Sequence, residues 1–276
     1  MKIKMIMLFL IICTSAGRIA AQNPETKLNW KLAAQAYTFK RFTFFEAVDK
    51  TDSCGLNYIE AFRGQELGGG LAGTMDFHMD TAKRMQILEK LKKKGIKMVS
   101  FGVINGTDEA DWRKLFEFAK AMQIENIVSE PKEEELGMLS GLCDEFKINL
   151  AIHNHTDPSH YWNPDILLKA IKGKSSRIGA CADIGHWIRS GLDPLTCLKK
   201  LKGHIKELHF KDLNEKSKYA HDVHWGTGVS NVDALIAELK KQRFKGIIAA
   251  EYEYNWYNNV PDVTASIKYF RQALSK

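Results

Sequence analysis

The chain has 276 residues, of which 45% are hydrophobic and 26% are charged, and its formal net charge is +7. This composition excludes a disordered or fibrous protein and fits one compact domain of the larger kind. The modest positive surplus is spread over lysine-rich stretches such as Leu91–Lys94. Such stretches are typical of solvated helix faces, so we expect no nucleic-acid partner. The oligomeric state stays open, with a homo-oligomer as one option.

The first residues of the chain have the features of a secretory signal. Two lysines precede an apolar run, Ile6–Cys13, which is too short to span a bilayer, and a pair of alanines before Gln22 offers a cleavage point. Ile12 stands where a lipoprotein would carry a small residue before its cysteine. We therefore expect residues 1–21 to be a signal peptide and the mature protein to be secreted or periplasmic, without an integral membrane segment.

The rest of the chain, residues 22–276, repeats one unit: a helix with a lysine-rich end, a glycine and an apolar run. Leu88–Gly95, Leu198–Gly203 and Leu239–Gly246 each precede such a run. Glycine suits the left-handed position after a helix, and lysine near a helix C-terminus complements the helix dipole. The apolar runs predict strands near residues 32–37, 56–62, 96–103, 124–130, 148–153, 177–183, 204–209 and 246–251. Eight strands alternating with helices predict a single α/β domain, a closed (β/α)8 barrel of the TIM type.

Two long stretches without periodicity interrupt this repeat. They run over residues 63–76, which include three consecutive glycines, and residues 212–229. Each follows a predicted strand, so both are expected on the face of the barrel where active sites lie. Long loops on that face are candidates for substrate contacts or lids.

Several predicted strands end in an acid or an imidazole. Parallel strands gather their C-terminal ends on one face, and the active sites of α/β barrels are built there. Carboxylate oxygens and imidazole nitrogens together suit one divalent cation, such as manganese, zinc, cobalt or magnesium. We expect Asp183, His209 and Glu251 to share this cation, with His153, Glu130 or both completing the site.

Three further residues stand close to these expected ligands. His186 follows the ligand on the sixth strand by three residues, within reach of a substrate hydroxyl or of the metal. Lys211 and His155 each follow an expected ligand by two residues and so share its strand face. A divalent cation lowers the pKa of a base beside it, which makes a neutral imidazole or amine available near neutral pH. We expect His155 or Lys211 to move a proton of a bound substrate.

The residues at the last three strands resemble the motifs of a known family. Asp183–His186, His209–Asp212 and Glu251 are similar to those of the xylose-isomerase-like barrels, which include sugar isomerases and epimerases, inosose dehydratase and AP-endonuclease-type repair enzymes. The likeness covers essentially the whole mature chain. It implies metal ligation by the first residue of each motif and a substrate near His186 and Lys211.

The fifth strand departs from the epimerase pattern. Epimerases of this family carry a glutamate there, as a metal ligand and as half of a two-carboxylate proton relay, whereas here the strand ends in Ala151–His155. The Glu-Asn-His pattern of metal-dependent 3-keto-glycoside lyases and C-glycoside deglycosidases is similar, and on that comparison His155 aligns with the base. The resemblance implies an isomerase or epimerase that acts on a keto sugar through an enediolate. The alternatives are a 3-keto-glycoside 1,2-lyase and a non-catalytic sugar-binding barrel.

The repair enzymes are the remaining comparison. Asp222–His224 resembles a metal-binding Asp-x-His of those enzymes, but they also need histidines at earlier strand ends, where this chain has Glu60–Phe62 and Phe101–Val103. A sugar or glycoside is therefore the expected substrate. Aromatic side chains stack on the apolar faces of sugar rings. The residues expected to contact the substrate are Tyr37, Glu60, Trp187, His224 and Trp256.

Overall fold

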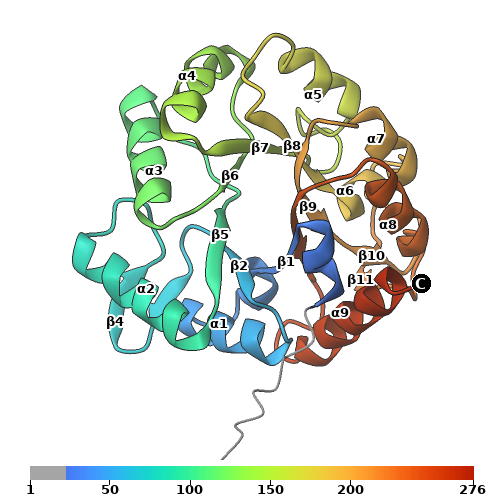
Figure 1. The fold of residues 1–276 in the computed structure, drawn as a ribbon, viewed down its shortest axis with the longest axis horizontal. Helices are drawn as coiled ribbons and strands as arrows, with labels where there is room; N and C mark the ends of the chain where they lie inside the picture. The colour runs from blue at the N-terminus through green and yellow to red at the C-terminus, as the bar shows by residue number, and fades with distance from the viewer. Residues whose placement is uncertain (1–22) are drawn as a thin grey trace, which may run out of the picture.

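The computed structural model describes residues 23–276, so the predicted signal peptide lies outside the described residues. Eight parallel strands close into one barrel in the order β1-β12-β9-β8-β7-β6-β5-β2 (Figure 1). The strands are β1 (Trp30–Gln35), β2 (Tyr58–Ala61), β5 (Lys97–Phe101), β6 (Asn126–Ser129), β7 (Asn149–His153), β8 (Ile178–Asp183), β9 (Ile205–Phe210) and β12 (Gly246–Ala250). The predicted (β/α)8 barrel is confirmed, and each predicted strand overlaps one of these eight.

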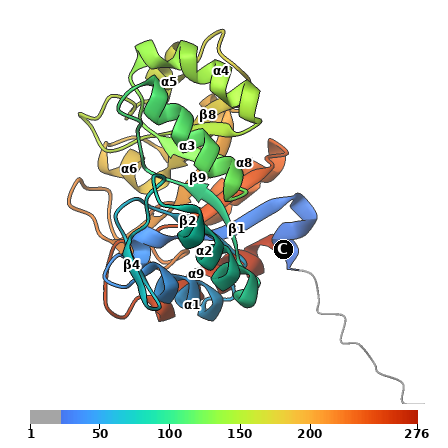
Figure 2. The same ribbon diagram turned by 90° about the vertical axis from the view of Figure 1, so that its left-hand side faces the viewer.

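Helices surround the barrel, and both views show α4 and α5 on the opposite side from α1 and α9 (Figures 1 and 2). The helices are α1 (Phe44–Ser53), α2 (Thr81–Lys94), α3 (Glu109–Ala121), α4 (Leu136–Phe146), α5 (Pro164–Ala170), α6 (Ile184–Arg189), α7 (Pro194–Lys200), α8 (Val232–Lys241) and α9 (Val260–Leu274), with 3-10 turns η1 (Pro24–Leu28), η2 (Ala36–Phe39) and η3 (Glu133–Glu135). Their apolar stripes face the strands; in α3, Trp112, Leu115, Phe116 and Ala119 are buried. Within residues 23–276, no helix is both long and apolar enough to cross a bilayer.

The expected glycine after each helix is present in two cases of three. Gly95 follows α2 with φ of 65°, and Gly203 lies beyond α7 with φ of 84°. After α8 the left-handed position is taken by Arg243, with φ of 53°, and Gly246 instead begins β12. A Cβ on Gly246 would lie 2.5 Å from the carbonyl oxygen of Lys206, so the close approach of β9 requires glycine there.

The two long stretches without periodicity contain short antiparallel hairpins. The first holds β3 (Glu66–Gly68) and β4 (Leu71–Thr74), and the second holds β10 (Asp212–Leu213) and β11 (Asp222–Val223). The tip of the first hairpin packs closely on α1, because a Cβ on Gly69 would lie 2.3 Å from the ring of Phe45.

The hydrophobic core lies mainly between the strands and the helices, while the barrel interior carries polar side chains. One of these is Glu207 of β9, which is fully buried. Its carboxyl oxygens accept hydrogen bonds from Ser100 Oγ, at 2.7 Å, and from Asn126 Nδ2, at 3.0 Å. Two residues further along β9, nearer the C-terminal end, stands His209.

Candidate active site

A cavity of about 440 Å³ opens where the barrel strands end. Its lining residues are Gln35, Tyr37, Phe62, Arg63, Gly102, Val103, His153, His155, His186, Glu251 and Glu253. A larger hollow, of about 650 Å³, lies along α9 between Cys54 and Arg271, but no acid or imidazole lines it. The chemistry therefore gathers in the smaller cavity at the strand ends.

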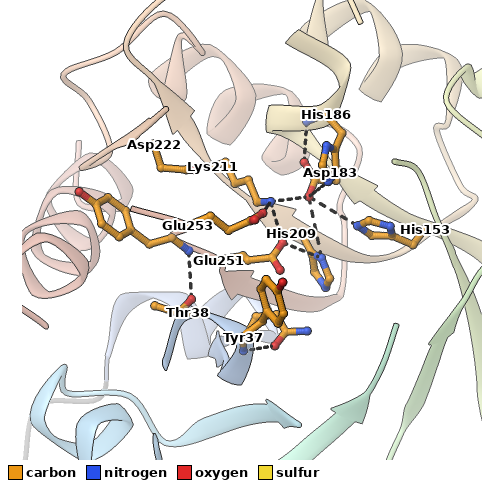
Figure 3. Close-up of polar contacts among 12 residues, drawn as sticks. Tyr37, Thr38, His153, Asp183, His186, His209, Lys211, Asp222, Glu251 and Glu253 are labelled. Carbon is orange, nitrogen blue, oxygen red and sulfur yellow. Dashed lines mark hydrogen bonds and ion pairs between the residues drawn. The ribbon is translucent and has the colours of Figure 1, made fainter. Parts of the chain in front are cut away.

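Four side chains converge at this cavity from four neighbouring strands. His153, Asp183, His209 and Glu251 each place one nitrogen or oxygen within 4.8 Å of the others, and all four are buried (Figure 3). His209 Nδ1 lies 3.1 Å from Glu251 Oε2, and His153 Nε2 lies 3.5 Å from Asp183 Oδ2. These four residues form what we call the strand-end cluster.

The converging atoms of the strand-end cluster lack hydrogen-bond partners among the described residues. They are His153 Nε2, Asp183 Oδ2, His209 Nδ1 and Glu251 Oε2. A buried polar atom without a hydrogen bond is costly. Although Lys211 is ion-paired with the two carboxylate oxygens, four such atoms around one point indicate a ligand that satisfies them together. Two imidazole nitrogens and two carboxylate oxygens fit a divalent cation. The residues present therefore fit the expected metal.

Asp183 is held in place by the turn that it begins. Its Oδ1 accepts a hydrogen bond from the backbone N–H of His186, at 2.7 Å, and so caps the N-terminus of α6, which leaves Oδ2 for the cluster. The side chain of Asn154 makes two hydrogen bonds to the backbone of Asp183, at 2.9 and 3.0 Å. A Cβ on Gly185 would lie 2.8 Å from Lys211 Cδ, so the glycine of the motif leaves room for that lysine.

Each imidazole of the strand-end cluster is held by a carboxylate behind it. Glu130 Oε1 lies 2.9 Å from His153 Nδ1, and Glu60 Oε2 lies 2.8 Å from His209 Nε2. Glu130 therefore stands behind His153 and outside the four-residue group. Glu60 was expected to contact the substrate, but it is fully buried beneath His209 and is not among the residues that line the cavity.

Lys211 is fully buried against three acids. Its Nζ lies 3.1 Å from Asp183 Oδ2 and 2.8 Å from Glu251 Oε2, and it also contacts Glu253 (Figure 3). Burial disfavours the ammonium ion, but these carboxylates hold the pKa of Lys211 well above its usual value. These contacts favour the charged form of Lys211, and its expected role as a proton acceptor stays a prediction.

Two further imidazoles line the cavity, one of them buried and the other partly exposed. His186 has its Nδ1 at 2.8 Å from the hydroxyl oxygen of Thr156, and burial lowers the pKa of His186 well below its usual value, so the ring is neutral. His155 is 48% exposed, and its Nδ1 contacts Glu130 Oε1. Burial would raise the pKa of Glu130, but its hydrogen bonds with His153 and His155 hold that pKa well below the usual value.

The expected substrate-contacting aromatic residues differ in position. Tyr37 lines the cavity and packs edge-on against Phe62 and Trp256, with ring centroids 5.3 and 6.0 Å apart. Trp187, by contrast, is 1% exposed within the hydrophobic core, because α6 begins directly at Asp183 and turns this residue inward. The structure therefore does not bring Trp187 to the cavity.

The Asp222–His224 segment also lies apart from the strand-end cluster. His224 is not among the residues that line the cavity. Asp222 Oδ2 accepts a hydrogen bond from Arg189 Nη2 at 3.1 Å. This segment therefore contributes no ligand to the four-residue group.

Several cavity residues were not predicted from the sequence. Glu253 follows Glu251 by two residues, so the alternation that singled out His155 and Lys211 would also have found it. Gln35 ends β1, where it accepts a hydrogen bond from the backbone N–H of Tyr37 at 2.7 Å. Neither Phe62 nor Arg63 had a signal beyond its place after a strand.

A closed parallel barrel with acids and imidazoles at its strand ends is typical of metal-dependent α/β-barrel enzymes. The sequence profile described as Xylose isomerase-like TIM barrel matches residues 48–273. The chain belongs to this family. No curated protein matches its sequence.

Solved structures agree with this assignment. A putative uncharacterized protein from Parabacteroides distasonis is 34% identical, with a TM-score of 0.74, and the match covers 88% of this chain and 99% of that one. A xylose isomerase-like TIM barrel protein from Mycobacterium smegmatis in complex with magnesium has 12% identity and a TM-score of 0.72, with 92% and 98% covered. The probable 3-DHS dehydratase AsbF of Bacillus anthracis has 15% identity and a TM-score of 0.66, with 86% and 97% covered. The last two likenesses show the fold alone.

Proposed function

We propose that this protein is a divalent-metal-dependent sugar isomerase or epimerase, which removes the proton next to the carbonyl of a keto sugar. The observation that carries the proposal is the strand-end cluster, whose four unpaired buried atoms surround one point. The same cavity is lined by His155, a partly exposed imidazole suited to proton transfer. Family membership supports this class of reaction without fixing the substrate.

The proposed roles follow from the positions of the side chains. A cation held by the strand-end cluster would supply a Lewis acid that polarises the carbonyl. His155 accepts the proton, because Glu130 occupies its Nδ1 and leaves Nε2 for the substrate. Figure 3 shows Lys211 and His153 approaching Asp183 from opposite sides, so the ammonium ion of Lys211 adds positive charge beside the carboxylate that would hold the cation.

A β-elimination is the second candidate, and the fifth strand favours it. Its last interior residue is His153, so a glutamate pair spanning β7 and β12 is not available for a two-carboxylate relay. A probable dehydratase among the similar structures has the same fold. Loss of a β-substituent from an oxidised glycoside shares its first step with epimerisation, since both begin with removal of the proton next to the carbonyl.

One experiment in heavy water tests the shared first step and separates the two outcomes. Protein loaded in turn with manganese, zinc, cobalt or magnesium is incubated with ketoses and with 3-keto-glucosides, and the products are followed by mass spectrometry. Deuterium incorporation with an isomeric product supports the isomerase or epimerase, whereas release of the glycosidic substituent supports the lyase. Sugar binding without deuterium exchange for any metal would instead identify a non-catalytic sugar-binding barrel.

The N-terminal sequence supports a proposal about location. We propose that residues 1–21 direct export and are removed before Gln22, because a basic start, a short apolar run and small residues follow one another there. N-terminal sequencing of protein recovered from the periplasm or medium should begin at or near Gln22. Recovery of only the full-length chain inside the cell would contradict export.

A further inference from the structure

The two imidazoles of the strand-end cluster are held through opposite ring nitrogens. Glu130 contacts Nδ1 of His153, and Glu60 contacts Nε2 of His209. The ring atoms left over are Nε2 of His153 and Nδ1 of His209, and these are the two unpaired imidazole atoms of the cluster. The carboxylate behind each ring therefore determines which nitrogen faces the shared point.

We infer that Glu60 is a positioning residue of the metal site, whose carboxylate accepts the Nε2–H of His209 and so directs Nδ1 of that ring to the cation. This inference rests on the metal site of the proposed function and deepens it. A carboxylate accepts hydrogen bonds and an imidazole that ligates a metal keeps one N–H, so a proton on Nε2 leaves the lone pair on Nδ1. The two rings lie 4.8 Å apart between centroids, with their planes tilted by 51°. Because the carboxylates contact opposite ring nitrogens, the two imidazoles present opposite tautomers to the shared point.

The surroundings of Glu60 indicate no other function. The side chain is fully buried and is not among the residues that line the cavity. Its second oxygen, Oε1, has no hydrogen-bond partner among the described residues, and Oε2 is occupied by His209. The register of β2 against β5 shifts between Ile59 and Glu60, an irregularity of the kind that redirects a side chain.

A neighbouring carboxyl provides the contrast. Glu207 is also fully buried in the barrel interior, but its oxygens accept hydrogen bonds from Ser100 and Asn126, and it makes none to His209. Glu207 and Glu60 thus share burial and residue type, and each has a carboxyl oxygen within 4.8 Å of a ring nitrogen of His209, but only Glu60 makes a hydrogen bond to that ring. Glu207→Gln is therefore the matched control for changes at Glu60.

Zinc titration of the full mature chain tests the inference. Glu60→Leu should weaken zinc binding by ~10–100-fold, the usual effect of losing the hydrogen-bond partner of a ligating histidine. Glu60→Gln should recover part of that loss, because the amide oxygen still accepts the Nε2–H, and Glu207→Gln should bind zinc as the unmodified chain does. A folded Glu60→Leu protein with zinc affinity within about threefold of normal would overturn the inference.

A second measurement on the unmodified chain covers the case in which Glu60→Leu does not fold. Long-range ¹H–¹⁵N spectra of the zinc-loaded protein identify which ring nitrogen carries the proton. We expect the proton on Nε2 of His209 and on Nδ1 of His153; a proton on Nδ1 of His209 would refute the role of Glu60 directly. Failure of the unmodified chain to bind any divalent metal would instead remove the proposed function itself.

Discussion

Two layers of the barrel interior contain buried acids, but their hydrogen bonding differs. In the upper layer, at the strand ends, one carboxylate oxygen of Asp183 and one of Glu251 have no hydrogen-bond partner among the described residues. In the lower layer, the carboxyl oxygens of Glu207 accept hydrogen bonds from Ser100 and Asn126. Both layers are buried, so burial alone does not distinguish a binding site from a structural network.

The charges of the two layers differ in the same way. Burial and the nearby Glu60 raise the pKa of Glu207 well above its usual value, so the lower carboxyl is neutral. Burial acts on Asp183 too, but the ammonium ion of Lys211 and the contact with His153 hold its pKa well below the usual value, so the upper carboxyl is ionised. Ionised acids that have an ion-pair partner in Lys211 but no hydrogen bond at the converging oxygens indicate a ligand, whereas a neutral acid with hydrogen-bonded oxygens indicates packing.

The largest expected effect comes from removing an upper acid. Asp183→Ala should weaken binding of a divalent metal by on the order of 100-fold or more, beyond the loss typical of a residue that only supports a ligand. Metal content after dialysis, measured by elemental analysis, checks this. If Asp183→Ala still bound a full equivalent of metal, the upper layer would not be the metal-binding one.

The next effect concerns proton transfer beside the upper layer. His155→Ala should lower kcat by ~10²–10⁴ on a verified substrate while metal content stays normal. The control is His160→Ala, because His160 is likewise exposed and paired with an acid, Glu133, but does not line the cavity. Normal turnover in His155→Ala would transfer the role of base to Glu253 or Glu251.

The unfolding free energy of the metal-free protein tests whether Lys211 compensates the negative charges of the upper layer. Lys211→Met removes the cation between three acids, so the metal-free variant should lose ~3–5 kcal/mol of unfolding free energy, as expected for a broken buried ion pair. Added metal should restore part of that loss, since it supplies positive charge at the same place. Denaturation curves with and without a chelator give both values, and equal stability of the metal-free variant and the unmodified chain would be the contrary result.

The smallest effect belongs to the lower layer and depends on pH. Because the pKa of Glu207 is raised in the folded state, the folded protein binds this proton more tightly than the unfolded chain does. The stability that this gives is complete below the unfolded pKa of about 4.3 and is lost as the pH rises toward the folded pKa. Glu207→Gln lacks this dependence, so its stability relative to the unmodified chain should rise between pH 5 and 8, by at most about 1.4 kcal/mol per pH unit. Urea denaturation of both proteins at pH 5 and at pH 8 measures this relative stability. A relative stability that stays constant or falls with pH would contradict the prediction.

The sequence predicted the architecture well, because each barrel strand is an apolar run with its own helix and turn signals. It also identified the residues of the strand-end cluster, since parallel strands of known phase bring their last residues to one face. Beyond these residues, the prediction relied only on the alternation of side chains between the two faces of a strand. It placed His155 at the cavity and would have placed Glu253 there too, but it failed at Trp187, where the chain had already become helical.

What the sequence did not predict depends on partners that are far apart in the chain. Glu60 and His209 are 149 residues apart in the sequence. Their hydrogen bond places the Glu60 side chain against the His209 ring, and Glu60 does not line the cavity. Lys211 was expected to lose its proton near a cation, whereas its contacts with three acids from two other strand ends favour the charged form. Pairing across the barrel, rather than local pattern, determines these roles.

The helix cap made by Asp183 limits how this site can be redesigned. One oxygen of this carboxylate caps the N-terminus of α6, and the other faces the strand-end cluster. Most replacements would therefore destabilise the start of the helix and remove a side chain from the cluster at the same time. Asparagine is the exchange that keeps the cap while removing the charge. Glu251 begins no helix, so an engineer seeking a different metal preference has a freer choice at that position than at Asp183.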